Sequence, residues 1–342
     1  MGARRADWVD KTAQLLRDDT AYFQVVFTIP DKLSSLVLGN RRALYKLLFR
    51  SAASALQRSI HDECGMQAAA TMVLHTWNQR LGHHAHIHAL VPGSGPSLDG
   101  KRWIECKMTK GTRSQPAKPI LVDNKVLGQT FCGRFMKKLN SLRRRGLLEL
   151  EGNCAYLQDP QRWTEFTASL VEHAWCVFME RPPTAESTPD HVLKYLARYM
   201  TGGPISDRRL VSCEADTITF LARSKDKSKP KQQVHEKLSG VEFMRRWSLH
   251  ILPKGFTKTR CYGGYSSRCR GNFIALCKQL CPPPPAETIS EAAPVATAQT
   301  DRNDDAPCCP RCQQAMQLTR NTQRPSWRDL FYGPSHQPWF ER

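Results

Sequence analysis

His84-Ala85-His86-Ile87-His88-Ala89-Leu90-Val91 is the most informative stretch of the chain. Its three histidines stand at alternate positions and lead into a run of apolar residues, which is the two-residue period of a β-strand. All three imidazoles are therefore expected on one face of this strand. Imidazoles gathered at one place suggest a metal site, although a surface strand can also carry histidines without a ligand.

Strand patterns on either side of the histidine strand predict an antiparallel sheet. The β-branched and aromatic run 22–29 is stopped by Pro30, and the run 71–77 precedes a turn around Gly82, after which the chain returns as the histidine strand. Consecutive strands joined by so short a connection usually pair antiparallel. Further strands are predicted at 102–106, 173–179, 216–222 and 233–238.

Helical patterns alternate with these strands, which predicts an α+β fold. Asn40 can cap a helix that runs to about Ile60, because leucines recur there at helical spacing. A basic helix over 125–145 ends at Gly146. Shorter helices are predicted over 190–200 and 241–250.

The chain divides into three parts by composition. Residues 1–20 are predicted to form a helix that is a connector or a remnant, and residues 21–275 the catalytic domain. Residues 276–342 contain a proline-rich linker and a cysteine-containing tail. We expect this C-terminal tail to be disordered, because its linker lacks core-forming residues.

The charge balance points to a polyanionic partner. Lysine and arginine number 50 against 31 aspartates and glutamates, so the 342 residues carry a formal net charge of +19. Such a surface attracts nucleic acid by counterion release, although a generally basic protein is the alternative. No apolar run approaches the ~20 residues that span a bilayer, and the first residues contain no hydrophobic signal core. We therefore expect a cytoplasmic protein without a membrane partner.

Two basic clusters are candidates for contacting phosphate. One is the predicted helix 125–145, and the other is the loop between the strands 216–222 and 233–238. Either cluster could instead be solvated surface. The candidate DNA-binding residues are Lys137, Lys138, Arg143 and Arg144 on the helix, and Lys225, Lys227 and Lys229 in the loop.

Tyr195 and Tyr199 are four residues apart in the predicted helix 190–200, so their hydroxyls can reach one site. Core packing is the ordinary explanation of that spacing, but Lys194 and Arg198 lie beside the tyrosines. A phenol with a pKa of about 10 is a poor nucleophile until the phosphate that it attacks is polarised. A divalent metal held by imidazoles can polarise a phosphate as a Lewis acid.

The pairing of His86-Ile87-His88 with a tyrosine-bearing helix resembles the HUH endonucleases. Further blocks extend the resemblance, over about residues 20–275, to the two-tyrosine rolling-circle transposases of bacterial insertion sequences, the IS-ninety-one type. The blocks stand in the order of that family: Phe27-Thr28-Ile29-Pro30, Leu74-His75-Thr76-Trp77-Asn78-Gln79, the histidine strand, Tyr195-Leu196-Ala197-Arg198-Tyr199 with Pro204-Ile205-Ser206, and Leu252-Pro253-Lys254-Gly255-Phe256.

The resemblance implies a central antiparallel sheet flanked by helices, with the tyrosine helix facing the histidines. It implies a transposase that nicks and joins single-stranded DNA, mainly at element ends, in a bacterial cell where it associates with the nucleoid. Tyr195 and Tyr199 would form 5′-phosphotyrosine links, and His86 and His88 would hold Mg²⁺ or Mn²⁺. The alternatives are a non-catalytic DNA-binding remnant and an HUH relaxase or replication initiator.

HUH sites commonly take a third polar ligand. Gln79, seven residues before the histidine pair and expected on the neighbouring strand, is the first choice. His191, one helical turn before Tyr195, is the second. Either residue could instead orient a histidine, and His75 and His84 have weaker claims.

The cysteines mark a departure from the family, whose members usually begin with a cysteine-rich zinc-binding domain. The first cysteine here is Cys64, so we expect a short variant or a truncated copy. Cys309 and Cys312 form a CxxC pair, which is half of a Zn²⁺ site, and Cys277 with Cys281 is the candidate for the other half. Unmetallated cysteines in a mobile tail are the alternative.

Overall fold

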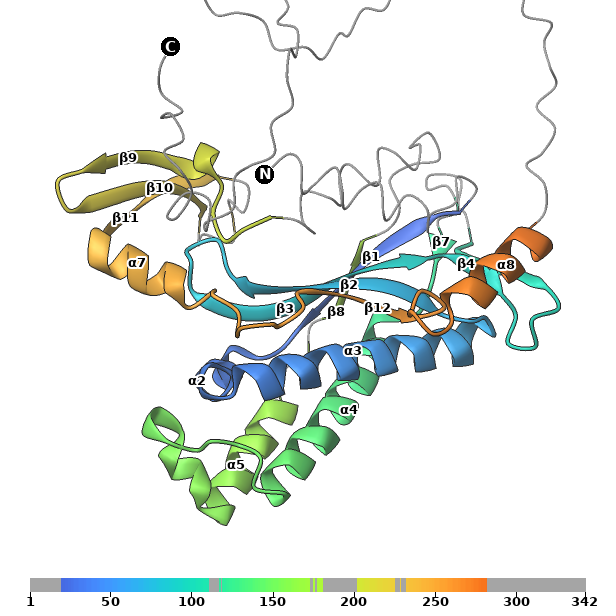
Figure 1. Cartoon of the computed structure of the whole chain (residues 1–342), viewed down its shortest axis with the longest axis horizontal. Helices are drawn as coiled ribbons and strands as arrows, with labels where there is room; N and C mark the ends of the chain where they lie inside the picture. Colours follow the sequence, from blue (N-terminus) through green and yellow to red (C-terminus); the bar gives the residue numbers. More distant parts are fainter. Residues whose placement is uncertain are drawn as a thin grey trace, which may run out of the picture. The chain divides into compact units, whose positions relative to one another are not determined.

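The computed structural model describes residues 20–110, 117, 119–172, 175, 177–180, 202–224, 228 and 232–281. Its centre is a five-stranded sheet in the order β12-β2-β3-β1-β8, and all neighbouring strands run antiparallel (Figure 1). The prediction of an α+β fold around an antiparallel sheet, with the histidines on the middle strand, is confirmed. The strands are β1 (Tyr22–Thr28), β2 (Ala69–Trp77), β3 (His83–Pro92), β8 (Val177–Glu180) and β12 (Thr259–Gly263).

Two long helices, α3 (Arg41–Cys64) and α4 (Asn124–Arg144), cover one face of this sheet (Figure 1). α3 ends at Gly65, whose φ of 70° is the left-handed conformation that commonly closes a helix. α4 begins where the Asp123 side chain accepts a hydrogen bond from the backbone N–H of Val126. Shorter helices complete the layer: η1 (Asp31–Leu33), α2 (Ser34–Gly39), η2 (Gly152–Gln158) and α5 (Pro160–Val171).

The main core lies between the sheet and these helices. Phe27 of β1 and Ile87 of β3 are fully buried, and the ring of Phe27 meets the edge of Phe131 on α4 with 5.2 Å between centroids. Because side chains alternate along a strand, His86 and His88 lie on the opposite face of the sheet from Ile87. The helices therefore cover the apolar face, and the histidines lie on the other one.

A second, three-stranded sheet lies beside the turn that joins β2 to β3 (Figure 1). Leu81 of that turn packs with Phe220 and Phe243 in a small separate core. The strand pair predicted at 216–222 and 233–238 is confirmed as an antiparallel hairpin. The elements of this region are η3 (Asp207–Arg209), β9 (Leu210–Glu214), β10 (Thr217–Arg223), β11 (Gln233–Ser239) and α7 (Gly240–Ser248).

Another small core forms around α8 (Arg270–Leu280), where Tyr265, Phe273 and Cys277 pack together. The turn that follows β12 requires glycine at position 263. Its φ is +60°, and a Cβ atom there would lie 1.9 Å from the carbonyl oxygen of Ala68. The short strands of this end are β4 (Ser94–Pro96), β5 (Trp103–Glu105), β6 (Lys107–Met108) and β7 (Pro119–Ile120).

Three elements differ from their sequence-based prediction. The Asn40 side chain does not cap α3, because it exchanges two hydrogen bonds with the backbone of Glu149 instead. β8 begins at Val177 rather than at 173, and Trp175 before it is buried with its indole N–H bonded to the backbone. α8 extends past residue 275 to Leu280, so packed structure continues into the predicted linker.

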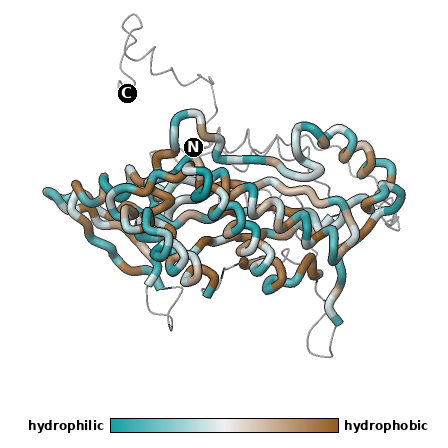
Figure 2. The backbone as a smooth tube through the Cα atoms, turned by 90° about the horizontal axis from the view of Figure 1, so that it is seen from below, coloured by the Kyte–Doolittle hydropathy of each residue, from teal (hydrophilic) through white to brown (hydrophobic). Residues whose placement is uncertain are grey.

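The predicted helix 190–200, residues 1–19 and residues 282–342 lie outside the described residues. Along the described helices, hydrophilic and hydrophobic segments alternate in Figure 2, as expected of helices with one buried side. No helix in the described part of the chain is long and apolar enough to cross a membrane.

Phe27→Ala tests the placement of the main core. We expect a loss of about 3–5 kcal/mol in the free energy of unfolding, because the substitution removes a fully buried ring that packs on Phe131. Urea denaturation followed by circular dichroism measures it. Val241→Ala, at a side chain that is 76% exposed, is the control and should change stability by less than about 0.5 kcal/mol. Equal losses in both variants would contradict this core.

Candidate metal centre

Three histidines from two neighbouring strands come together on the sheet face opposite α3 and α4. His75 of β2 pairs with His86 of β3 across the strands, and His88 lies two residues further along β3. One ring nitrogen from each of the three lies within 4.8 Å of the other two, and the ring centroids are 4.6 to 5.4 Å apart. This arrangement can coordinate a single divalent ion.

Burial keeps two of these imidazoles neutral. Loss of hydration is the main cause that lowers the pKa of His86 to about 4 and that of His88 to about 3. The neighbouring His86 ring contributes further to the low pKa of His88. A neutral imidazole keeps the lone pair that a metal needs, so protons do not compete for these ligands at pH 7.

A hydrogen bond to the backbone orients the ring of His86. Its Nδ1 lies 2.9 Å from the carbonyl oxygen of His84, and Nδ1–H donates because a carbonyl can only accept. In the neutral ring the lone pair is then on Nε2, which is free to coordinate an ion. The ring of His84 itself lies 2.8 Å from a carboxylate oxygen of Asp31 and is outside the group of three.

Gln24 of β1 is buried beside His88. The side-chain Nε2 atom of Gln24 lies 2.8 Å from His88 Nδ1, and Gln24 Oε1 is buried without a hydrogen-bond partner among the described residues. With the amide in the opposite orientation, Oε1 would face Nδ1 and accept a hydrogen bond from Nδ1–H, which leaves the lone pair of His88 on Nε2. Gln24 is therefore a candidate for orienting His88 toward a metal.

A half-buried cation, Lys258, borders the histidines. Lys258 Nζ lies 5.0 Å from the centre of the Trp77 ring, and Trp77 stacks on His75 with 4.5 Å between ring centroids. Lys258 also donates a hydrogen bond of 2.8 Å to the carbonyl of Gly202, and burial lowers its pKa to about 8. Its charge lies where it would stabilise an anion bound at the histidines.

The structure corrects the placement of Gln79, the first choice for a third ligand. β2 ends at Trp77, and Gln79 lies in the exposed turn beyond it, where its backbone carbonyl accepts a hydrogen bond from Arg209. The expectation that Gln79 lies on the neighbouring strand is therefore wrong. His75 lies on that strand, directly opposite His86. The register shifts between Trp77 and His75, so counting residues back from the turn would have paired His75 with Ala85 instead.

Two further residues of the site were missed by the sequence analysis. Gln24 is a polar residue in an apolar strand and belongs to no recognisable motif. Lys258 follows the Leu252–Phe256 block in a segment without periodic pattern. Only the folded sheet brings Gln24, from the start of the chain, and Lys258, from its last third, next to the histidines.

Of the predicted phosphate-binding residues on α4, Lys137 and Arg144 are exposed and Lys138 is half-buried. Arg143 instead donates to the carbonyl of Gln158 at 2.6 Å, which joins α4 to η2. Cys277 is buried in the core around α8, Cys281 is half-buried just after it, and the zinc site stays a prediction. The remaining predicted site residues lie outside the described residues: Tyr195, Tyr199, His191, Lys194, Arg198, Lys225, Lys227, Lys229, Cys309 and Cys312.

Comparison with known proteins places the chain in the class of the transposases. It is 34% identical over 321 residues to the putative transposase y4qJ of Sinorhizobium fredii, and the match covers 92% of this chain and 76% of that protein. It is 25% identical over 256 residues to the transposase for insertion sequence element IS801 of Pseudomonas savastanoi pv. phaseolicola, with 75% of this chain and 57% of that protein covered.

A family model matches residues 69–272 of the chain, which include β2, β3 and the three histidines. The chain belongs to the family Y2_Tnp, described as "Putative transposase". Among solved structures, a conjugative relaxase TrwC in complex with oriT DNA is 11% identical, with a TM-score of 0.18 over 52% of this chain and 69% of that one. A likeness this low says nothing about the chemistry of the present chain.

Alanine substitutions of His75, His86 and His88 test the metal centre. Mn²⁺ should raise the thermal unfolding midpoint of the unchanged protein, because an ion that binds only the folded chain stabilises it. We expect each substitution to abolish the rise, measured by differential scanning fluorimetry during Mn²⁺, Mg²⁺ and Zn²⁺ titrations. His84→Ala is the matched control, since its ring is adjacent but outside the group. A rise that persists in all three variants would exclude this centre.

Gln24→Leu tests the orientation of His88. We expect Mn²⁺ affinity to fall by about 10- to 100-fold, because the nonpolar side chain cannot hold His88 Nδ1–H. Gln24→Glu should restore or increase the affinity, since its carboxylate accepts the same proton. Isothermal titration calorimetry measures both variants, and an unchanged affinity in Gln24→Leu would show that Gln24 has no such role.

Proposed function

We propose that this chain is a metal-dependent transposase that nicks and joins single-stranded DNA at element ends, in rolling-circle transposition within the bacterial nucleoid. The observation that carries the proposal is the group of His75, His86 and His88 on the middle strand of the sheet, in a chain of a transposase family. The net charge of +19 supports a nucleic acid as substrate. The insertion-sequence transposase among its relatives supports DNA.

We assign the metal to His75, His86 and His88, with His75 in the position first considered for Gln79 or His191. An ion held there supplies Lewis-acid polarisation of the scissile phosphate. Mg²⁺ and Mn²⁺ are the proposed ions. Three imidazoles fit Mn²⁺ better than Mg²⁺, because Mg²⁺ prefers oxygen ligands and keeps its waters.

Chain connectivity supports Tyr195 and Tyr199 as the nucleophiles. The Lys258 amine, which borders the histidine group, holds the carbonyl of Gly202. Tyr199 is three residues before Gly202, and an extended chain of three residues spans at most about 11 Å. Tyr195 is seven residues before it, which corresponds to at most about 25 Å. These chain lengths are compatible with either tyrosine reaching the histidines.

The proposed reaction needs no external energy source. The phenol of one tyrosine gives up its proton as its oxygen attacks the phosphorus, the bond from phosphorus to the 3′-oxygen breaks, and the departing 3′-oxygen takes up a proton, so no proton is gained or lost overall. The product is a 5′-phosphotyrosine and a free 3′-OH. A 3′-OH of another strand then attacks the phosphotyrosine and releases the phenol, while the second tyrosine permits a paired cleavage. Lys258, with Lys194 and Arg198 near the tyrosines in sequence, would neutralise phosphate charge.

A covalent adduct assay tests this function. Incubation with fluorescent single-stranded oligonucleotides carrying element ends, with Mn²⁺ or Mg²⁺, should give a protein–DNA adduct that survives denaturing electrophoresis. We expect Tyr195→Phe, Tyr199→Phe to abolish the adduct, because neither side chain then has an attacking oxygen. His86→Ala should reduce it at least ~100-fold by removing a metal ligand.

The outcomes separate the competing functions. An adduct in the double tyrosine variant would exclude these nucleophiles. Salt-dependent DNA binding without any adduct, in the presence of each metal, would show a DNA-binding remnant instead of an enzyme. Mass spectrometry of the trapped peptide identifies which tyrosine carries the DNA.

A further inference from the structure

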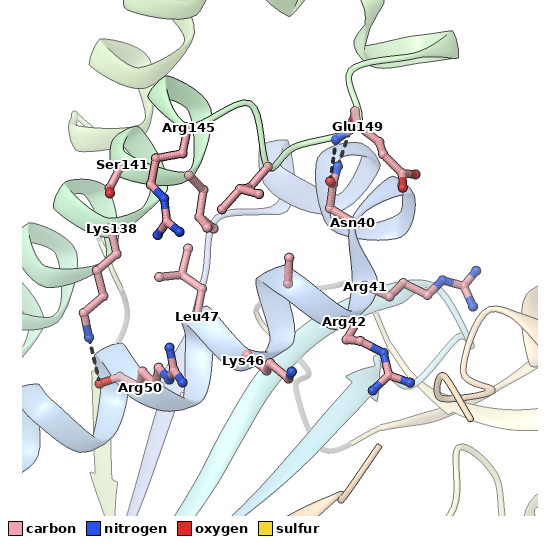
Figure 3. Close-up of a pocket in the computed structure, with 14 residues that line it drawn as sticks. Asn40, Arg41, Arg42, Lys46, Leu47, Arg50, Lys138, Ser141, Arg145 and Glu149 are labelled. Carbon is pink, nitrogen blue, oxygen red and sulfur yellow. Dashed lines mark hydrogen bonds between the residues drawn. The ribbon is translucent and has the colours of Figure 1, made fainter. Parts of the chain in front are cut away.

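A basic hollow lies between the first half of α3 and the last turns of α4 (Figure 3). Its volume is about 640 Å³, and it is open to solvent. Asn40 joins its two sides: the Asn40 side-chain amide donates a hydrogen bond to the carbonyl of Glu149 and accepts one from the backbone N–H of Glu149, each 2.8 Å long. The basic residues that line the hollow are Arg41, Arg42, Lys46, Arg50, Lys138 and Arg145.

The positive charge of this hollow is not matched by acidic groups. Glu149 is the one carboxylate that lines it, and its side chain points away from the centre (Figure 3). No ion pair between described residues involves any of the six basic side chains. Arg41 and Arg42 donate to the carbonyls of Ile251 and Lys254, so Lys46, Arg50 and Arg145 remain as exposed cations.

Positive charges lie close together around Lys138. Burial and then the guanidinium groups of Arg50 and Arg134 hold the pKa of Lys138 below its ordinary value. The amine of Lys138 also donates to the backbone carbonyl of Arg50, which brings it to the floor between the two helices (Figure 3). A bound anion would relieve this repulsion.

We infer that this hollow binds the phosphate backbone of duplex DNA. Arg42, Lys46 and Arg50 follow each other every four residues along α3, and Arg42 bonds Lys254 through one guanidinium nitrogen alone, so its other N–H groups can face a phosphate. The three residues span about 12 Å, which corresponds to between three and four base-pair steps of about 3.4 Å. The described lining contains no aromatic side chain. Sites for single strands typically stack bases on aromatic rings, whereas duplex backbones are held by cations alone.

The duplex site is separate from the histidine group. α3 and α4 cover the apolar face of the sheet, and the histidines lie on the other face. The role of this site in transposition rests on the proposed function, because it would hold the double-stranded part of the DNA whose single strand is cut at the other face. Binding of duplex DNA itself does not depend on any nicking activity.

Charge reversal of the three exposed cations tests the inference. In Lys46→Glu, Arg50→Glu, Arg145→Glu we expect the affinity for a 20-base-pair duplex without element ends to fall at least ~10-fold at 0.1 M salt. The slope of log K against log salt concentration should fall by about three, one for each lost phosphate contact. Fluorescence anisotropy measures both, and circular dichroism melting establishes that the variant folds.

A matched control carries the same change of charge elsewhere. Lys125→Glu, Arg270→Glu, Lys278→Glu alters three exposed cations outside the hollow and should retain most of the duplex affinity. The hollow variant, Lys46→Glu, Arg50→Glu, Arg145→Glu, should still form the adduct with a short single-stranded oligonucleotide, if the unchanged protein forms one. An equal loss in both triple variants, or a larger loss for single strands than for duplex, would overturn the inference. Absence of the adduct in the unchanged protein would instead refute the proposed function and leave the duplex measurement decisive.

Discussion

The alternation of side chains along β3 determines both the main core and the histidine group. Ala85 and Ile87 are buried against the helices, while His86 and His88 point to the other face. A shift of the strand by one residue would place the imidazoles in the apolar core and expose Ile87. Burying unpaired polar rings there is costly, so the hydrophobic core itself enforces the register that brings His86 opposite His75.

The same burial gives the histidines their chemistry. Removal from water disfavours the charged imidazolium, so His86 and His88 stay neutral far below their ordinary pKa range. Neutral rings can coordinate metal only if the other nitrogen carries the proton, and the carbonyl of His84 provides that for His86. The arrangement of the candidate ligands on β3 therefore depends on the strand, its burial and one backbone carbonyl.

Sequence patterns predict the parts of the fold that depend on local periodicity. β1, β2, β3, the long helices and the β10–β11 hairpin lie where the sequence patterns predict them. Side chains whose role depends on distant partners are not predictable in this way. The sequence predicts Asn40 as a helix cap, but its side chain bonds to Glu149, which is 109 residues later. The sequence predicts Arg143 as a phosphate contact, and its side chain also bonds to the carbonyl of Gln158.

In the candidate metal centre too, some residues follow from a local pattern and others depend on distant partners. His86 and His88 follow from a motif within one strand, whereas their partners come from other strands, through registers that are set by the fold. The end of β2 at Trp77 is where the run 71–77 predicts it, but the register shift that brings His75 opposite His86 leaves no trace in the sequence, so spacing alone favours Gln79. The tyrosine assignments depend on the resemblance and on chain connectivity to Gly202, so for them the adduct assay decides.

The segment between α7 and β12 connects the two proposed DNA contacts. At its start, the carbonyls of Ile251 and Lys254 accept hydrogen bonds from Arg41 and Arg42, which line the basic hollow. At its end, Lys258 lies beside Trp77 and the histidine group. The two proposed DNA contacts thus lie on opposite sides of the sheet, and one segment of the chain contacts both. If duplex DNA binds at α3 and the cut strand at the histidines, as proposed, that strand has to leave the duplex and pass the edge of the sheet, because the sheet separates the two faces. The two proposed contacts together therefore require a substrate that is double-stranded at one end and single-stranded where the tyrosine would attack.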